Sequence, residues 1–414
     1  MTAHSIYSAS AAGRWVNCVG SIALAHGAPK GSSAAAREGT AGHALGEQCL
    51  RNNQEPLDFE GEVFEVEGQD IPVTDDLAHA VQKYVDYVRG ISGVKLYEVR
   101  VYYARMLGVP DDEAFGTADC IIVDGTTMHV IDLKLGRRYV DPAKNKQLML
   151  YAAGEADVLE SLGETIENIV LHIVQPRVTA APQTYAMTRG ELAEVVQEFE
   201  QAVSRAEQAQ LLFQPSWAAD GFSSTDALNW IDLYLLDGEA QCQWCPAASY
   251  CPRLRATVDD FIPSAPEEFD MVTALQLTDG AVIADALNKV PLLKIWIDAV
   301  EHEGFRRLSN RDKVPGYKLV TGREGNRKWT DAAAVEAEFG DLGDAIHEKK
   351  LLSPAKLEKV LKKDPRASKI AALTHRNPAR PTMASADDPR KEWVEAAGAD
   401  EFDVVPTEPD GSLA

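Results

Sequence analysis

Two aspartates and a lysine between positions 119 and 134 have the types and the spacing of a metal-binding site. If Gly125 and Thr126 are the central residues of a β-hairpin, Gly125 supplies the positive φ that a type II′ turn requires. Asp119 then faces Asp132 across the ladder, with Cβ atoms about 5 Å apart. Carboxylates at that distance repel each other, and a divalent cation bound between them removes the repulsion.

Lys134 lies two residues beyond Asp132 and therefore projects from the same face of the strand. Its ammonium group can approach a water molecule or a phosphate at the metal. Ile131 and Leu133 face the other way and can pack in the core. The alternative is a surface hairpin with ordinary exposed charges, but the apolar neighbours favour a buried strand, where three charges on one face are costly without a purpose.

Four further polar residues lie at helical spacing and could support such a site. Gln147 and Tyr151 are four residues apart, so they share a helix face and could hold a nucleic-acid strand or orient Lys134. His43 and Glu47 share a face in the same way, and His43 could offer an imidazole to the metal. Each pair alone is typical of an ordinary helix, so these residues count only together with the hairpin.

Four cysteines could form a separate metal centre: Cys18, Cys242, Cys245 and Cys251. The last three form a C-x2-C-x5-C run, and a metal shared with the distant first one would staple the two ends of the intervening segment together. Spacing alone leaves both Zn²⁺ and a [4Fe–4S] cluster open. Cys49 and Cys120 have no partner at ligand spacing and are expected to be small core residues.

The composition of the 414 residues is that of a globular protein, with 45% hydrophobic and 25% charged residues. Neither a signal peptide nor a run of about 18 apolar residues is found, which predicts a cytoplasmic protein without a membrane segment. The net charge of −23 argues against a broad basic surface that coats nucleic acid, but it allows a local basic groove. Candidate nucleic-acid contacts are Arg137, Arg138, Arg323, Arg327 and Trp329.

Apolar periodicity and turn residues predict alternating helices and strands. Helices are expected at 33–52 (at least from Thr40 as the N-cap), 75–92, 143–160 and 188–213, the last behind a Thr-Arg-Gly-Glu capping box. Strands are expected at 97–103, 115–123, 128–135 and 169–174. The predicted organisation is an α/β domain at 1–258, a linker at 259–270, a mostly helical domain at 271–374 and a largely disordered acidic tail at 375–414.

Four motifs in this order resemble the RecB-like branch of the PD-(D/E)XK nuclease superfamily: Gly-x-x-x-His ending at His43, Gly-x-x-Asp ending at Asp119, Asp-x-Lys at 132–134 and Gln-x-x-x-Tyr at 147–151. The cysteines are similar to those of its iron–sulfur members, such as the AddB nuclease domain and the CRISPR-associated RecB-like exonucleases. The layout, including 316–320 and 326–331, is similar to a phage-encoded family of that superfamily. The nuclease resemblance covers about residues 10–255.

The resemblance implies an α/β fold with a restriction-endonuclease-like core, in which helices flank a mixed central sheet, an iron–sulfur cluster staples the domain and a mostly helical region follows. It implies Mg²⁺ or Mn²⁺ ligands at His43, Asp119, Asp132 and the Leu133 carbonyl. Lys134 would activate water or stabilise phosphate charge, with Gln147 and Tyr151 in support. Asp132 stands where many members have glutamate, and Glu98 is a weaker match to an acidic position of the family.

The function implied by the resemblance is that of a metal-dependent DNA exonuclease acting on single strands or free ends. The protein would be located in the cytoplasm, or in the host cell's cytoplasm if it is phage-encoded. Its role would be the resection of DNA ends for recombination, together with a single-strand annealing protein. A structure-specific endonuclease with the same site is one alternative. A non-catalytic nucleic-acid-binding or scaffold protein for recombination partners is another, and the complete set Asp119, Asp132 and Lys134 disfavours it.

Overall fold

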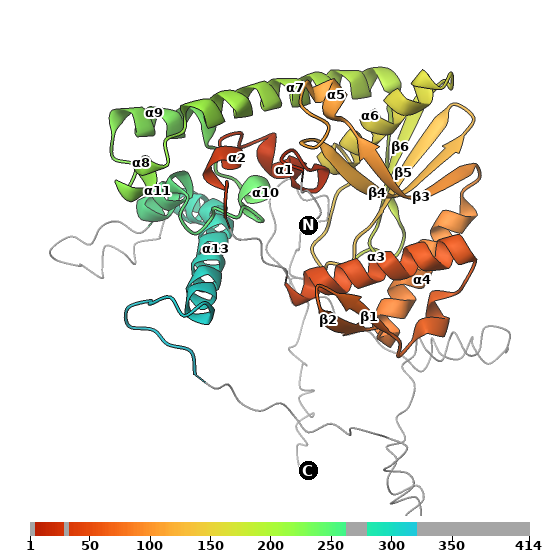
Figure 1. The fold of residues 1–414 in the computed structure, drawn as a ribbon, viewed down its shortest axis with the longest axis horizontal. Coiled ribbons are helices and arrows are strands. Elements are labelled where there is room, and N and C mark those ends of the chain that lie inside the picture. The colour runs from red at the N-terminus through yellow and green to blue at the C-terminus, as the bar shows by residue number, and fades with distance from the viewer. Residues whose placement is uncertain (1–4, 29–32, 262–279, 321–414) are drawn as a thin grey trace, which may run out of the picture. The chain divides into compact units, whose positions relative to one another are not determined.

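The computed structural model describes residues 5–28, 33–261 and 280–320. The chain divides into two compact units, Met1–Val320 and Thr321–Ala414, and every described residue belongs to the first unit. Helices flank a central mixed sheet in this unit (Figure 1), which confirms the predicted α/β class.

Five strands form the central sheet in the order β3-β4-β5-β6-β7. They are β3 (Val94–Tyr102), β4 (Phe115–Asp124), β5 (Thr127–Leu133), β6 (Asn168–Val174) and β7 (Gln183–Thr188). Only β5 and β6 are parallel among these neighbours. A parallel pair needs a crossover connection, and helix α6 (Lys146–Ser161) lies in it. A separate hairpin consists of β1 (Val63–Val66) and β2 (Gln69–Pro72).

The described helices fall into two groups along the chain. The earlier ones, besides α6, are η1 (Ala9–Ala11), α1 (Ala12–Trp15), α2 (Ser21–Leu24), α3 (Ala34–Asn52), η2 (Pro56–Phe59), α4 (Asp75–Gly90) and α5 (Ala104–Leu107). The later ones are α7 (Arg189–Leu212), α8 (Ser216–Ala219), α9 (Thr225–Tyr234), α10 (Glu239–Cys242), α11 (Pro252–Phe261) and α13 (Gly280–Ser309). No described helix is both long enough and apolar enough to cross a membrane.

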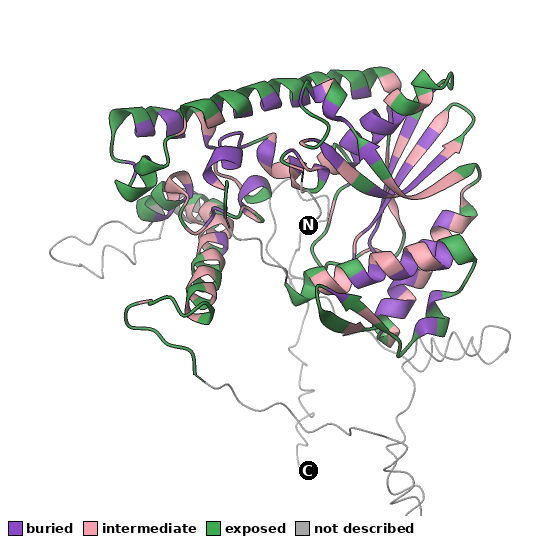
Figure 2. Cartoon of the chain, in the orientation of Figure 1, coloured by how far each residue is buried: buried purple, intermediate pink, exposed green. Residues whose placement is uncertain are grey.

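The central strands of the sheet are buried on both faces, so the sheet has two hydrophobic cores (Figure 2). Successive side chains of a strand point to opposite faces, and β4 and β5 are apolar in both directions. Ile121 and Val130 belong to the core that includes α6 and α7. Ile122 and Ile131 belong to the core that includes α3 and α4. All four side chains are fully buried, as predicted for these strands.

The hairpin between β4 and β5 has the predicted register as far as Cys120, but the predicted pair of Asp119 and Asp132 is not part of the ladder. Asp124 pairs with Thr127, and the pairing continues to Cys120 opposite Ile131. Gly125 has a φ of 59°, the sign that the predicted type II′ turn requires at its first central residue. The local sequence therefore determined which residues of the two strands lie opposite each other.

Other local predictions are confirmed in type and corrected in their limits. Helix α3 begins after Ser33, whose hydroxyl accepts a hydrogen bond from the Ala36 N–H, so Thr40 is not its cap. Thr188 and Glu191 form the predicted capping box of α7. Strand β7 was not predicted. It lies at the edge of the sheet, where half-buried and exposed residues alternate, and it contains few apolar side chains that would mark it as a strand.

Helix α13 packs on the segment that holds the C-terminal cysteines. Its Ile295 shares a small hydrophobic cluster with Cys242, Ala248 and Leu254. This contact joins part of the predicted helical region to the cysteine segment within one compact unit.

Several predictions fall on residues outside the described ones. Helix α11 extends into the predicted linker at 259–270, but residues 262–279 are not described, so the division there stays a prediction. The contacts proposed for Arg323, Arg327 and Trp329 also lie outside the described residues, as does the acidic tail.

Candidate metal centre

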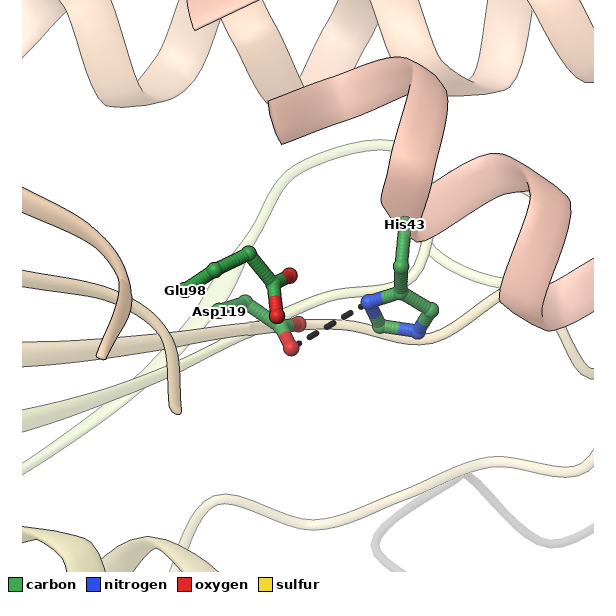
Figure 3. Close-up of side chains that lie close together, drawn as sticks. All are labelled: His43, Glu98 and Asp119. Atoms are coloured by element: carbon green, nitrogen blue, oxygen red, sulfur yellow. Dashed lines mark ion pairs between the residues drawn. The ribbon is translucent and has the colours of Figure 1, made fainter. Parts of the chain in front are cut away.

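Three side chains from different elements converge in one place: His43 of α3, Glu98 of β3 and Asp119 of β4 (Figure 3). One ligand atom of each lies within 4.8 Å of the ligand atoms of the other two. His43 Nδ1 is 3.2 Å from Asp119 Oδ1. An imidazole and two carboxylates at this spacing could hold a metal ion.

A glycine allows helix α3 to bring His43 close to the sheet. A Cβ atom at Gly42 would lie 2.2 Å from Leu135 Cδ1 and 3.1 Å from Leu77 Cδ1. Both leucines are buried. A larger residue at this position would require the helix or the Leu135 side chain to shift, so Gly42 favours the close approach of the imidazole to Asp119.

The pairing of β3 with β4 is interrupted at the site. Tyr97 pairs with Cys120 and Val99 pairs with Ala118, but Glu98 and Asp119 are not paired between them. Glu98 has a φ of 48°, in the left-handed region that non-glycine residues adopt at a cost of about 1–3 kcal/mol.

At the interruption, both strands change the side of the sheet to which alternate side chains point. Ala118 packs in the core with α6, whereas Cys120, two residues on, packs in the core with α3 and α4. Val99 and Tyr97 of β3 are divided in the same way. Regular strands would keep residues two apart on one face. The reversal lets the carboxylate of Asp119 reach His43 on the side of α3.

The charges of the three ligands influence one another strongly. Burial, followed by the negative charge of Asp119, raises the pKa of Glu98 to about 7. Burial lowers the pKa of His43, but the Asp119 carboxylate outweighs it and raises the value to about 9. Burial also acts to raise the pKa of Asp119, yet His43 and the Leu133 N–H together lower it. The imidazolium thus partly compensates a concentration of negative charge.

The buried Asp132 and the partly exposed Lys134 form an ion pair beside this group. Asp132 is 2% exposed, and its Oδ2 lies 2.8 Å from Lys134 Nζ. Gln147 connects the two, since its Nε2 donates to Asp132 Oδ1 (3.0 Å) and its Oε1 accepts from Lys134 Nζ (3.1 Å). The Tyr151 hydroxyl accepts a longer bond from Gln147 Nε2 (3.4 Å). The four residues therefore form one network.

The predicted metal ligands are grouped differently in the structure from the grouping that the sequence predicted. It gathers His43 and Asp119 with Glu98, while Asp132 is engaged by Lys134 and Gln147 on the side of α6. Leu133 contacts the site through its N–H, which donates to Asp119 Oδ2 (2.7 Å). The reason is the strand interruption, which turns Asp119 toward α3. The roles of Asp132 and of the Leu133 carbonyl as ligands stay predictions.

The four cysteines of the predicted cluster lie in two adjoining hydrophobic clusters. One contains Cys18, the other contains Cys242, and Cys245 and Cys251 pack against both. No three cysteine sulfurs among the described residues lie within 4.8 Å of one another. In a tetrahedral zinc site they would be about 3.8 Å apart, given a Zn–S bond of about 2.3 Å. The sulfurs are thus near one another without forming a compact ligand set.

The two remaining cysteines occupy the positions predicted for core residues. Cys49 and Cys120 are both fully buried. Burial raises the pKa of Cys49 to about 11 and that of Cys120 to about 12, so neither is a reactive thiolate at neutral pH.

The loop between β5 and α6 connects the two regions. Arg138 contacts Gln243 and Glu239 of the cysteine segment, and Lys146 Nζ donates to Asn17 Oδ1 (3.2 Å) beside the first cysteine. Arg137 is exposed. Of the two predicted nucleic-acid contacts in this loop, one is engaged by the protein itself.

One family model matches a stretch of the chain that includes both candidate metal sites. A family model described as Protein of unknown function (DUF2800) matches residues 4–391, a range that contains both the acidic group and the cysteines. Because the match covers most of the 414 residues, this chain belongs to the DUF2800 family.

Proposed function

We propose that this protein is a metal-dependent deoxyribonuclease of the PD-(D/E)XK type. The observation that supports the proposal best is the acidic group of His43, Glu98 and Asp119, which adjoins the ion pair of Asp132 and Lys134. Partly buried charged side chains are costly unless they are paired or bind an ion, so their concentration here favours a functional site.

The donor atoms fit Mg²⁺ or Mn²⁺. Both ions prefer carboxylate oxygens, and Mn²⁺ also accepts an imidazole nitrogen. His43, Glu98 and Asp119 would hold the ion. No described donor makes an aligned hydrogen bond to Asp132 Oδ2, so this oxygen could turn toward the ion as well. A bound ion would polarise the phosphodiester and make a water molecule more acidic.

The remaining residues would act on the substrate directly. The Lys134 side chain is 28% exposed while Asp132 and Gln147 fix the position of its Nζ, so it can meet negative charge that develops on a phosphate. Gln147 would keep the lysine in place, and Tyr151 in turn supports Gln147. The exposed Arg137 would contact the DNA backbone beyond the site.

For the cysteines we propose a [4Fe–4S] cluster with a structural role, because hydrolysis needs no electron. The choice of cluster rests on the resemblance of Cys18, Cys242, Cys245 and Cys251 to the cysteines of iron–sulfur nucleases, since no three of the four sulfurs lie within 4.8 Å of one another. Structural zinc is the alternative. The thiols, all raised in pKa chiefly by burial, would have to release protons on binding either.

The test is incubation of anaerobically purified protein with end-labelled linear and circular DNA, with and without Mn²⁺. Mn²⁺-dependent release of labelled nucleotides from linear DNA alone indicates the exonuclease, with a single-strand annealing protein as its proposed partner. Cleavage of circular or branched DNA indicates the endonuclease. Lys134→Ala should abolish either activity, and Lys83→Ala, an exposed lysine of α4, serves as the control. Binding without any cleavage would leave only the scaffold role.

A further inference from the structure

Beyond the strand interruption, β3 and β4 carry a second group of side chains on the side of the metal centre. Arg100 pairs with Thr117, and Tyr102 pairs with Phe115. Their neighbour Val101 packs in the core with α6, so by strand alternation Arg100 and Tyr102 face the other side, toward which Glu98 also turns. The residues follow the ligands along the same two strands.

Arg100 is stacked on aromatic rings instead of forming an ion pair. Its guanidinium carbon lies 3.9 Å from the centre of the Phe115 ring and 5.6 Å from that of Tyr102. No carboxylate within the described part of the chain forms an ion pair with it, although Arg105, on the neighbouring helix α5, pairs with Asp157. Arg100 is exposed and Tyr102 is 50% exposed.

This arrangement fits a strand of nucleic acid by its chemistry. A stacked guanidinium is held in one orientation while its N–H edges stay free, and those edges match phosphate oxygens. A half-exposed ring offers a face on which a base can stack. The chain has a net charge of −23, yet Arg100 forms no ion pair with any residue that the structure describes, although carboxylates lie nearby. An anionic ligand that contacts both Arg100 and the metal centre would explain this.

We propose that Arg100, Tyr102 and Phe115 form a platform that binds single-stranded DNA next to the metal centre. Arg100 contacts a phosphate, Tyr102 stacks on a base, and the largely buried Phe115 holds the guanidinium in place. The platform rests on the proposed nuclease function and adds to it the substrate form: a strand whose bases are unpaired at the site of cleavage.

The test is fluorescence anisotropy of the full chain with a labelled single-stranded DNA oligonucleotide, in EDTA so that no cleavage occurs. Arg100→Ala should weaken binding about tenfold and reduce the slope of log K against log salt by about 0.7, the value for one lost phosphate contact. Tyr102→Ala should weaken binding about tenfold, and Tyr102→Phe should restore it. Arg105→Ala is the matched control, since this arginine is exposed but stacks on neither ring, and it should bind like the wild type.

An abasic oligonucleotide of equal length separates the two contacts. The effect of Arg100→Ala should persist on this probe, while that of Tyr102→Ala should disappear because no base is left to stack. Equal binding by wild type, Arg100→Ala and Tyr102→Ala would overturn the platform.

Cleavage assays with Mn²⁺ on the same variants distinguish this proposal from the nuclease function. If the wild type cleaves DNA and neither substitution weakens cleavage, the platform is refuted and the nuclease function remains. Arg100-dependent binding without cleavage refutes the nuclease and leaves the platform. A wild type that neither binds nor cleaves refutes both.

Discussion

The two candidate metal sites of this protein are built in opposite ways. The acidic group takes its ligands from α3, β3 and β4, which are packed in the cores of the sheet, and its donor atoms already lie within 4.8 Å of one another. The cysteine site takes its ligands from short helices and turns at both ends of residues 18–251, and no three of its sulfurs are as close.

This difference indicates what each metal would contribute. The folded core holds the acidic ligands together without an ion, so a metal there should matter for chemistry more than for stability. The cysteine segments have small hydrophobic clusters of their own, and a bound metal would add the connection that joins them. The following predictions test the two halves of this comparison.

The largest expected effect is the loss of catalysis when one acidic ligand is neutralised. Asp119→Asn keeps an oxygen for the Leu133 N–H but removes the charge that faces His43 and the metal. We expect Mn²⁺-dependent cleavage to fall at least 100-fold. The Tm from circular dichroism should change by only a few degrees, and full activity would remove Asp119 from the site.

A cysteine substitution should have the reverse profile. Cys251→Ala should release the bound metal and lower the Tm by about 10 °C, because a structural site contributes several kcal/mol to folding. Iron and zinc content of anaerobically purified protein, measured with the Tm, checks this. Cys49→Ala is the control, since that thiol is buried apart from the cluster and its loss should leave the metal content unchanged.

Two glycines of α3 test whether packing alone positions His43. Gly42→Ala should displace the helix from Leu135 and weaken Mn²⁺ binding about tenfold, as measured by calorimetry. Gly39→Ala, in the same helix, meets nothing within 4 Å and should raise stability by up to about 1 kcal/mol. If both variants bind Mn²⁺ equally, the close approach at Gly42 is not what positions the imidazole.

The smallest expected effect is on the pH dependence of the free energy of unfolding, and it originates in the sheet, away from both candidate metal sites. Burial, together with His129, lowers the pKa of His172 to about 3, and its ring contacts Tyr87 and His129. The unfolded chain, with a histidine pKa of about 6.5, binds the proton more readily, so this stability is present above pH 6.5 and is lost as the pH falls toward 3. Between pH 7 and pH 5 the loss should be about 2 kcal/mol.

Chemical denaturation at both pH values measures this loss. His172→Phe should reduce the pH dependence of unfolding, whereas Cys251→Ala should lower stability at both pH values alike. An unchanged pH dependence in the His172 variant would show that the acid sensitivity originates elsewhere.

Prediction from the sequence succeeded where neighbouring residues decide the structure. Gly125 specified the turn, and the turn determined the register from Asp124 to Cys120. The same holds for the capping box of Thr188 and Glu191. Residue spacing alone did not predict Glu98 at the site, and only the family resemblance suggested it, as a weaker match, because nothing local shows that β3 and β4 interrupt their pairing at the same point.

The sequence by itself determined the order of the long helices and of four strands of the central sheet, the β4–β5 hairpin and the identity of the polar residues near it, but not β1, β2 or β7. Only the tertiary structure decided which of them meet. Glu98 joins His43 because the packing of α3 on the sheet, which Gly42 permits, brings together residues 55 positions apart. Asp132 instead pairs with Lys134 and Gln147, because the strands reverse their faces at Asp119, and such a reversal depends on the two cores together and not on either strand alone.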